Sequence, residues 1–535
     1  MPRKSAVVDK QALRAEREKE IAKEQEKAQF LEEMRLLRPL RAFCVKEDTS
    51  TLDHLGLFRG PGLPGPGLRD GDDLSDDDSD EDGGGGGSAA VVGKKRPAAI
   101  MMLLSEVGIL PVVFEFVSCT DIFRHRLWSR GMLRMIARMP LTLRVSKLEG
   151  LAMCVFLREA SEDGGTYLFP FPHLKGLHLT SLSDRHVTNL APAITQGALE
   201  KLSTLHVDFV PTEGLLGINL FFSTMQRRAP PRLRTLDLMG SYLGDEGFQQ
   251  LANLFSSGCC DCVEHLLISQ NGCSDRGVTK VLKAIAGPGC DVILKTLDLG
   301  RNNIGDDGAR LLFKTLRQQP LRSLRTLNFR ANQFGHAAVT AALVGSVAKR
   351  GCTTWRNLDL SQNPIGDQGL TPFFEAFAGN VAGCPYGLLT CALSGTELGD
   401  STADALSEVL QSGMLQNLTA LDLSFNWIHA SGMRSIGAAL TRHCVPRLKT
   451  LNLGNNHGGD EGIDHLSVAL QLGGCRALQV LDISFNQGAR CMQHLAMVIK
   501  KNCCPSLREL VVTGNAPPHI RPHRLFKGVP HLYTR

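Results

Sequence analysis

The stretch Leu294-Lys-Thr-Leu-Asp-Leu-Gly-Arg-Asn-Asn-Ile304 decides the fold, because variants of it return about every 30 residues through most of the chain. Its pattern is Leu-x-x-Leu-x-Leu-x-x-Asn-x-Leu. Twelve copies begin at Leu174, Leu202, Leu233, Val263, Leu294, Leu324, Trp355, Leu388, Leu418, Leu448, Leu478 and Leu507. A unit this short cannot bury its own leucines, so each must stack on its neighbours. The sequence therefore predicts a solenoid of repeats.

Each copy predicts a strand, a turn and a helix. The alternating leucines are typical of a short strand with one buried face. An asparagine follows in eight of the twelve copies, where its amide can satisfy backbone groups that the turn leaves unpaired. Several copies continue with Gly-Asp-x-Gly, as at 244–247 and 305–308, and the aspartate is placed to cap the following helix. We therefore expect an α/β horseshoe of about twelve strand–helix repeats with a parallel concave sheet.

These repeats resemble the ribonuclease-inhibitor class of leucine-rich repeats over roughly residues 170–515. The resemblance implies a horseshoe whose concave surface binds a protein. The class includes ribonuclease inhibitors, activators of Ran-type GTPases, innate immune sensors and axonemal components, so the fold leaves the partner open.

An aspartate recurs between the second and third leucines of alternate copies, at Asp237, Asp298, Asp359, Asp422 and Asp482. This position should face outward on the concave strands. One interpretation is an acidic ladder that attracts a basic partner. The other is a strand-compatible residue inherited by duplication, because basic residues three positions earlier would partly neutralise the row.

Aromatic residues stand beside the turn asparagine in two copies, as Phe425, Trp427 and Phe485. An exposed aromatic residue on a concave face is a natural hot spot for binding. The alternative is that these side chains pack against neighbouring loops. With the five aspartates, they are the candidate partner-binding residues.

Enzyme motifs are missing from the sequence, which contains no phosphate-binding Gly-x-x-x-x-Gly-Lys-Ser/Thr, no His-Glu-x-x-His and no Gly-x-Ser-x-Gly. We expect no catalytic residues and no cofactor. The net charge of +5 is small for 535 residues, and no basic stripe with interleaved aromatics favours nucleic acid.

The 16 cysteines mostly fall three or four residues before a repeat begins, so they are repeat-position residues at the helix-to-strand corner. Cys259 and Cys262 have Cys-x-x-Cys spacing, but the second such pair that a zinc site needs is absent, and we expect no metal. Neither a signal peptide nor a membrane span is apparent. These features favour the cytoplasm, with a nuclear, cytoskeletal or axonemal place left open.

The N-terminal region divides into three segments by composition. Residues 1–58 predict a charged helix and linker, and residues 59–98 predict a disordered Gly/Pro and acidic linker. Within the acidic run, Ser75 and Ser79 each precede three acidic residues, a pattern typical of acidophilic kinase substrates.

Residues 99–145 are interpreted either as a helical cap on the solenoid or as an F-box-like segment. The segment resembles an F-box in residues that would contact a cullin-ligase adaptor: Phe116, Val117, Asp121, Ile122, Leu127 and Trp128. The solenoid is then expected over residues 146–516, with a C-terminal tail over 517–535.

These patterns predict a non-enzymatic scaffold or adaptor that binds a protein partner through the concave face of its repeats. Membranes and nucleic acids are not among the expected partners. Two alternatives follow from the resemblances: an F-box-type substrate receptor of a cullin ubiquitin ligase, and a Ran-type GTPase activator.

Overall fold

A computed structural model describes residues 142–145, most of residues 173–515, and the short pieces 525–526 and 533–534. Residues 196, 198, 211–214, 317, 380 and 442–443 are gaps within the main stretch. The predicted charged helix, the linker with Ser75 and Ser79, and the F-box-like residues Phe116 to Trp128 all lie outside the described residues.

The described strands form one parallel sheet in which each strand pairs with its neighbours in chain order. From β4 to β13 every strand has three residues, and only the middle one is buried. The strands are β1 Thr142–Val145, β2 Gly176–Leu182, β3 Thr204–Phe209, β4 Thr235–Asp237, β5 His265–Leu267, β6 Thr296–Asp298, β7 Thr326–Asn328, β8 Asn357–Asp359, β9 Thr390–Ala392, β10 Ala420–Asp422, β11 Thr450–Asn452, β12 Val480–Asp482, β13 Glu509–Val511 and β14 Tyr533–Thr534.

Strands β2 to β13 are the twelve predicted copies, which confirms the α/β solenoid. The sheet also includes β1, whose Leu143 pairs with Leu177, and β14, whose Tyr533 pairs with Glu509. It therefore extends on both sides beyond the expected range of 146–516. The division of the preceding residues into three segments stays a prediction.

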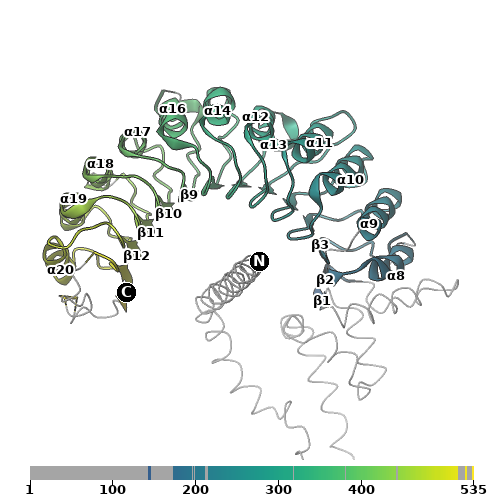
Figure 1. Ribbon diagram of the computed structural model, residues 1–535, viewed down its shortest axis with the longest axis horizontal. Coiled ribbons are helices and arrows are strands. Elements are labelled where there is room, and N and C mark those ends of the chain that lie inside the picture. The colour runs from purple at the N-terminus through teal and green to yellow at the C-terminus, as the bar shows by residue number, and fades with distance from the viewer. Residues whose placement is uncertain are drawn as a thin grey trace, which may run out of the picture. The chain divides into compact units, whose positions relative to one another are not determined.

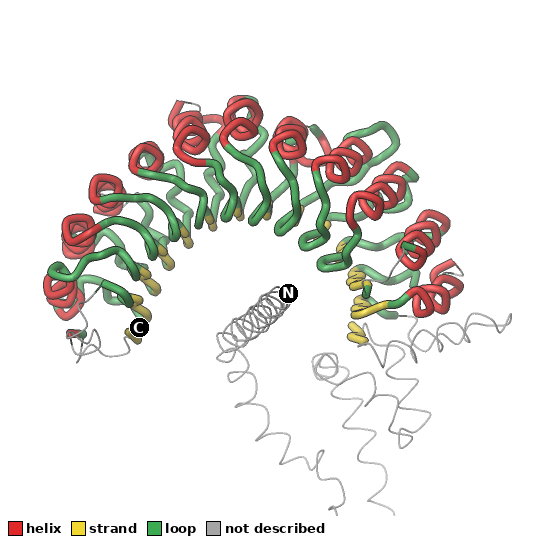
Figure 2. Tube along the Cα trace, viewed as in Figure 1, coloured by secondary structure: helices red, strands yellow, loops and turns green. Residues whose placement is uncertain are grey.

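Helices return the chain from each strand to the next and form the outer layer of the arc, with the strands along its inner edge (Figures 1 and 2). They are α8 Asp184–Thr195, α9 Leu216–Arg227, α10 Gly244–Ser256, α11 Asp275–Ile285, α12 Asp306–Thr315, α13 Gln319–Arg322, α14 His336–Ala338, a π-helical turn Val339–Leu343, α15 Val344–Ala348, α16 Gly366–Gly379, a 3-10 turn Val381–Gly383, α17 Asp400–Gln411, α18 Ala430–Thr441, α19 Gly459–Gln471 and α20 Met492–Lys500. None of the helices in this part of the chain has the length and apolar character needed to cross a bilayer.

The core is a continuous apolar layer between the strands and the helices. The repeat leucines fill it, as Leu297 and Leu327 do, and aromatic rings fill the wider spaces. Phe329 stacks on Phe334 with ring centroids 4.6 Å apart, and the ring of Phe313 meets both edge-on. The apolar interior therefore runs through neighbouring repeats without interruption.

The turn asparagines bind two repeats at once. The Asn302 side-chain Nδ2 donates to the carbonyls of Leu299 in its own repeat and Ile268 in the preceding one, at 3.0 and 3.1 Å. Its Oδ1 accepts from the backbone N–H groups of Asn271 and Cys273, both at 3.1 Å. The prediction that the asparagine satisfies backbone groups of the turn is confirmed. Some of these hydrogen bonds join neighbouring repeats.

The aspartates of Gly-Asp-x-Gly correct one expectation. Asp245 lies in the first turn of α10, yet its Oδ1 accepts from the N–H groups of Ser274 and Gly277 at the start of α11, at 2.8 and 3.1 Å. In the same way Asp275 accepts from Gly305 and Gly308, at 2.7 and 3.0 Å. Each aspartate thus caps the helix of the next repeat, because the helices lie side by side and the carboxylate points across rather than along its own axis.

Candidate protein-binding surface

The inner face of the arc is built from the first and third residues of each strand, which are half-buried beside a buried middle residue. Asp298 and Asp359 are third residues of β6 and β8, and the other ladder aspartates close β4, β10 and β12. The row therefore lies on the inner face, as the alternation predicts.

Every ladder aspartate also has a structural task. Its Oδ1 accepts from the backbone N–H two residues later, as between Asp298 and Gly300 at 3.0 Å and between Asp359 and Ser361 at 2.9 Å. The same bond occurs at Asp237, Asp422 and Asp482. In the intervening repeats the neutral side chains of Asn328 and Asn452 make it too, at 3.1 and 3.0 Å. The turn therefore needs the oxygen and not the charge, and the ladder's part in binding stays a prediction.

Burial affects the charge of one member of this row, Asp298. Desolvation raises the pKa of Asp298 above its ordinary value, although hydrogen bonds from Gly300, Asn328 and Ser269 act in the opposite direction. A half-buried carboxylate with one oxygen engaged in its own turn presents less charge to a partner than an exposed one.

At the N-terminal end of the same row the sequence reasoning missed two histidines. His178 of β2 pairs in register with His206 of β3, which pairs with Asp237. The two imidazoles stack with centroids 5.4 Å apart, and His206 Nδ1 lies 2.7 Å from Asp237 Oδ2. Counting repeat positions back from Asp237 would have found both residues.

The three candidate aromatic residues are exposed. The exposed fractions of Phe425, Trp427 and Phe485 are 63%, 57% and 52%. Phe425 and Phe485 are two repeats apart, about 10 Å at the usual spacing of neighbouring strands. Their side chains therefore lie near one another on one rim of the inner face.

The backbone at these two phenylalanines is left-handed, with φ of 55° and 52°. Each follows its strand by three residues, and the same position has positive φ in ten successive repeats: Gly240, Gln270, Arg301, Ala331, Gln362, Gly395, Phe425, Asn455, Phe485 and Gly514. We call this row the left-handed column. Glycine and asparagine adopt this conformation at little cost, whereas a bulky side chain does so under strain. Phe425 and Phe485 therefore stand at a left-handed position where glycine or asparagine would cost less free energy.

Phe485 is both exposed and packed against a neighbouring loop, the two interpretations that the sequence left open. Its ring lies over Gly514 in the next repeat, where a Cβ atom would collide with Cδ1 and Cε1 of the ring. Half of the side chain still faces solvent. Packing against the neighbouring loop fixes the ring and leaves one face open, which reduces the entropy lost when a partner binds.

Polar side chains lie between the aromatic residues. The rings of His429 and His457 stack with centroids 5.4 Å apart, and the Gln487 side-chain Nε2 lies 3.4 Å from His457 Nδ1. The rim at these repeats therefore mixes aromatic rings with hydrogen-bonding groups, as protein interfaces commonly do.

Tyr242 is a further exposed aromatic residue that the sequence reasoning missed. It stands at the repeat position of Trp427, five residues after the last residue of its strand, and is 62% exposed. Met239 is exposed beside it. Counting repeat positions in the sequence would have matched Tyr242 with Trp427. This repeat carries Ser241 in place of the turn asparagine, so the correspondence was not recognised.

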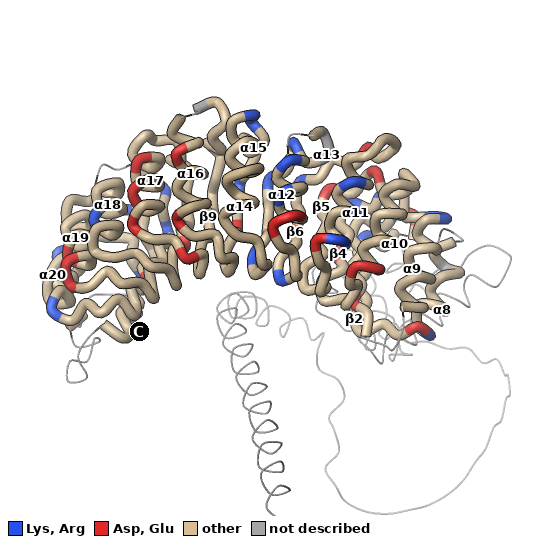
Figure 3. Tube along the Cα trace, turned by 45° about the horizontal axis from the view of Figure 1, so that its top comes forward, with Lys and Arg blue, Asp and Glu red and all other residues tan. Residues whose placement is uncertain are grey.

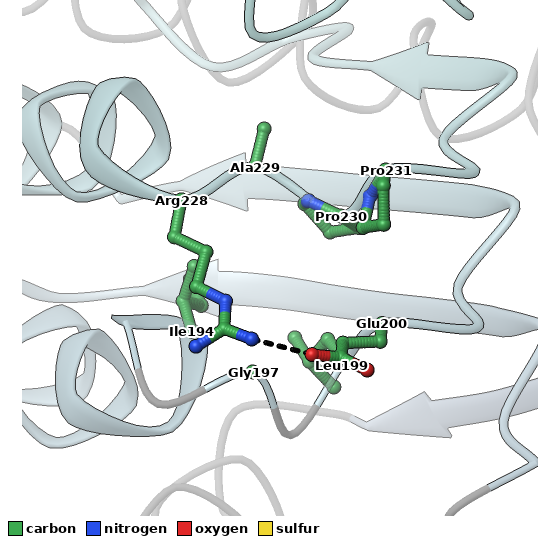
Figure 4. Close-up of a pocket in the computed structure, with 8 residues that line it drawn as sticks. All are labelled: Ile194, Gly197, Leu199, Glu200, Arg228, Ala229, Pro230 and Pro231. Atoms are coloured by element: carbon green, nitrogen blue, oxygen red, sulfur yellow. Dashed lines mark hydrogen bonds and ion pairs between the residues drawn. The ribbon is translucent and has the colours of Figure 1, made fainter.

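Two hollows on the surface do not resemble active sites. One, of about 170 Å³, lies between Ile194, Leu199 and Pro230 and is bordered by the ion pair of Arg228 Nη2 with Glu200 Oε1 at 2.5 Å (Figure 4). The other lies beside α20, between Met497, Lys500 and Lys501. Neither is lined by a serine, cysteine or histidine.

Buried cysteines such as Cys260, Cys352 and Cys475 are free thiols. Burial raises the pKa of the Cys260 and Cys475 thiols to about 12, so both stay protonated near neutral pH. Among the described residues no group of three or more His, Cys, Asp or Glu side chains is arranged to hold a metal ion.

Comparison with known proteins defines the class. The family model "Leucine Rich repeat" matches residues 293–313, 351–374 and 415–437. The ribonuclease inhibitor of Sus scrofa is 26% identical over 373 residues, which are 63% of this chain and 75% of that protein. This chain is a ribonuclease-inhibitor-like leucine-rich repeat protein.

Other relatives are matched over a smaller part of their length. The mouse NACHT, LRR and PYD domains-containing protein 12 is 28% identical over 274 residues, and the mouse Tonsoku-like protein is 28% identical over 227 residues. These matches take in 50% and 42% of this chain but only 24% and 16% of those proteins. Among solved structures, an internalin of Listeria monocytogenes aligns over 71% of this chain and 93% of its own, at 15% identity and a TM-score of 0.37.

Proposed function

We propose that this chain is a non-enzymatic scaffold that holds a protein partner on its concave face, with Phe425, Trp427 and Phe485 as the anchor. The observation that carries the proposal is the pair of exposed phenylalanines in left-handed backbone. Strain of this kind costs stability and is concentrated at functional sites. The left-handed turn is common to ten repeats, but it does not call for an exposed phenylalanine, so a binding role accounts for the two rings.

The class of protein supports the same conclusion, since leucine-rich repeat proteins generally act in protein–protein interaction. The ladder aspartates Asp237, Asp298, Asp359, Asp422 and Asp482 would line the bound partner, although the second carboxylate oxygen of Asp237 already contacts His206. Binding energy is concentrated in a few buried aromatic residues at most interfaces. We therefore assign the main contribution to the rings.

The experiment replaces both phenylalanines by the residue that the intervening repeat already uses, in the double variant Phe425→Asn/Phe485→Asn. Asn455 shows that asparagine suits the same left-handed position. The matched control is Leu472→Asn at the end of α19, where an apolar side chain is 59% exposed on the helix side. Tagged full-length chains are recovered from cells, and co-purified proteins are identified by mass spectrometry.

We expect the double variant to lose a partner that the wild-type chain and Leu472→Asn both retain. The thermal unfolding midpoint of each variant shows whether the chain is still folded. Recovery of the same partners, in the same amounts, by all three folded chains would contradict the proposal.

We also propose that the chain works in the cytoplasm, since the buried free thiols of Cys260, Cys352 and Cys475 suit a reducing compartment. Imaging of the tagged full-length chain tests this, and exclusive recovery from the secretory pathway would overturn it. The F-box-like segment and the Ran-type activity remain predictions from the sequence, because no described contact bears on either.

A further inference from the structure

Four arginines gather on the middle repeats of the inner face. Arg301 and Arg330 follow β6 and β7 on the rim that carries the left-handed column, and the Arg301 backbone N–H donates to the Arg330 carbonyl at 2.7 Å. Arg325 and Arg356 precede β7 and β8 on the opposite rim, where the Arg356 N–H donates to the Arg325 carbonyl at 2.6 Å. Each pair is thus fixed side by side by the backbone. In Figure 3, blue segments lie on the inner edge of the arc beneath α12 and α14.

These arginines lack carboxylate partners among the residues that the structure describes. Arg330 Nε donates to Gln362 Oε1 at 3.2 Å, and Arg356 Nη1 donates to the Gly387 carbonyl at 2.8 Å. By contrast, Arg234 and Lys295 on the preceding repeats both reach Glu264, at 3.6 and 2.7 Å. Like charges side by side on neighbouring strands destabilise a sheet, so the fold itself gains nothing from these pairs.

On the rim of the left-handed column the positive charge is confined to these repeats, whereas on the opposite rim Lys449 and Arg508 stand one residue before β11 and β13, as Arg325 and Arg356 do before β7 and β8. The nearby acids of the inner face are Asp298 and Asp359, each half-buried with one oxygen in its own turn. Further along, the left-handed column is neutral at Gln362 and Gly395, and Glu397 is exposed beside it. A long polyphosphate would meet repulsion there, whereas a short acidic stretch followed by apolar residues would not.

The distance to the aromatic anchor fits one extended chain. Arg301 and Phe425 occupy the same column four strands apart, on the order of 19 Å at about 4.8 Å per strand. An extended peptide spans that distance with about six residues. One partner segment along the left-handed column can therefore reach Arg301 and the phenylalanines together.

We propose that the partner is a protein that presents an extended acidic segment. Its carboxylates pair with Arg301, Arg330, Arg325 and Arg356, and an aromatic or aliphatic residue about six positions away rests on Phe425 and Phe485. Guanidinium groups suit this role because they bind carboxylates in a bidentate fork. This inference rests on the proposed function and adds the chemistry of the partner.

The test measures fluorescence anisotropy of labelled probes with the full-length chain. The main probe is a synthetic peptide with four glutamates at one end and Phe-Leu about six residues later. One control peptide has glutamine in place of every glutamate, and a single-stranded RNA of equal net charge is the second. We expect the acidic peptide to bind about tenfold or more tightly than either control at low salt.

The variant Arg301→Gln/Arg330→Gln should lower the affinity for the acidic peptide about tenfold and reduce its salt dependence. The matched control Arg447→Gln/Arg476→Gln removes two exposed arginines from the loops before β11 and β12 and should leave the affinity unchanged. Equal binding of the acidic and glutamine peptides, equal loss in both variants, or tighter binding of the RNA would overturn the inference.

The two proposals can fail separately. If Phe425→Asn/Phe485→Asn loses a cellular partner while Arg301→Gln/Arg330→Gln retains it, the aromatic anchor stands and the acidic partner is wrong. If neither variant loses a partner, the proposed function fails as well.

Discussion

The carboxylate of Asp245 in α10 lies so close to Gly277 in α11 that a Cβ atom on Gly277 would stand 2.6 Å from its Oδ1. The same relationship joins Asp275 to Gly308, again at 2.6 Å. In Gly305-Asp306-Asp307-Gly308 and in the related Ser274-Asp275-Arg276-Gly277, the aspartate and the final glycine therefore serve different contacts. The glycine makes room for the carboxylate of the preceding repeat, and the aspartate reaches the repeat that follows.

A methyl group at Gly277 should be destabilising. The variant Gly277→Ala meets Asp245 Oδ1 and Cys273 Sγ within 2.8 Å, and we expect a loss of about 1–3 kcal/mol in the free energy of unfolding. The control Gly345→Ala lies in α15, where nothing stands within 4 Å of the added atom, and should be neutral or slightly stabilising. Urea unfolding followed by circular dichroism compares the two. Equal stability of both variants would mean that the carboxylate moves aside freely.

The aspartates that cap the next helix should make the stability of the fold depend on pH. Burial raises the pKa of Asp245, but hydrogen bonds from Ser274 and Gly277 outweigh it, so the net pKa lies below the ordinary 3.8. A carboxyl group with a lowered folded pKa stabilises the fold above its unfolded pKa and loses that contribution as pH falls through the folded one. We expect Asp245→Asn to be less stable than wild type at pH 7 and to approach it as the pH drops below 3.8.

The measurement for this cap is the thermal unfolding midpoint from pH 7 to strongly acidic pH. Asp291→Asn, at an exposed aspartate in the loop before β6, is the control and should follow the wild-type curve. A constant difference between Asp245→Asn and wild type at every pH would show that the carboxylate charge is not what stabilises the α11 N-terminus.

The ladder can be tested without disturbing the fold. Because Asn328 and Asn452 make the same turn bond, Asp298→Asn and Asp359→Asn should change the free energy of unfolding by less than about 0.5 kcal/mol. Removing these two charges beside the arginines should strengthen binding of an acidic peptide. The anisotropy assay checks this, and weaker binding of the natural partner would instead favour the basic-partner interpretation of the ladder.

The cysteines should differ sharply in reactivity. The thiolate is the reactive form, and burial raises the pKa of Cys352 and Cys391 while removing both from solvent. We expect Cys262, which is exposed, to be alkylated by iodoacetamide in the native chain well before either of them. Peptide mapping after timed alkylation gives the order of reaction. Early labelling of Cys352 would mean that its repeat opens readily.

Much of the architecture could be predicted from residue patterns alone. The alternation of Leu294, Leu297 and Leu299 predicts a strand with one buried face because side chains alternate along any extended chain. The recurrence of that pattern predicts a stack, since one copy cannot bury its leucines alone. The asparagine of the turn followed from the same register, which left open whether Phe425 and Phe485 are exposed or packed against neighbouring loops.

The sequence by itself therefore determined the structure within each single repeat: its strand, turn, helix and buried leucines. The tertiary structure decided which residues of different repeats meet. Asp245 and Gly277 are 32 positions apart in the chain, and Arg301 and Arg330 are 29, yet stacking makes both pairs neighbours. The left-handed backbone under Phe425 and Phe485 also appears only in the fold. The physical reason is that alternation is a local property of the backbone, whereas contacts between repeats depend on how the stacked core sets their register.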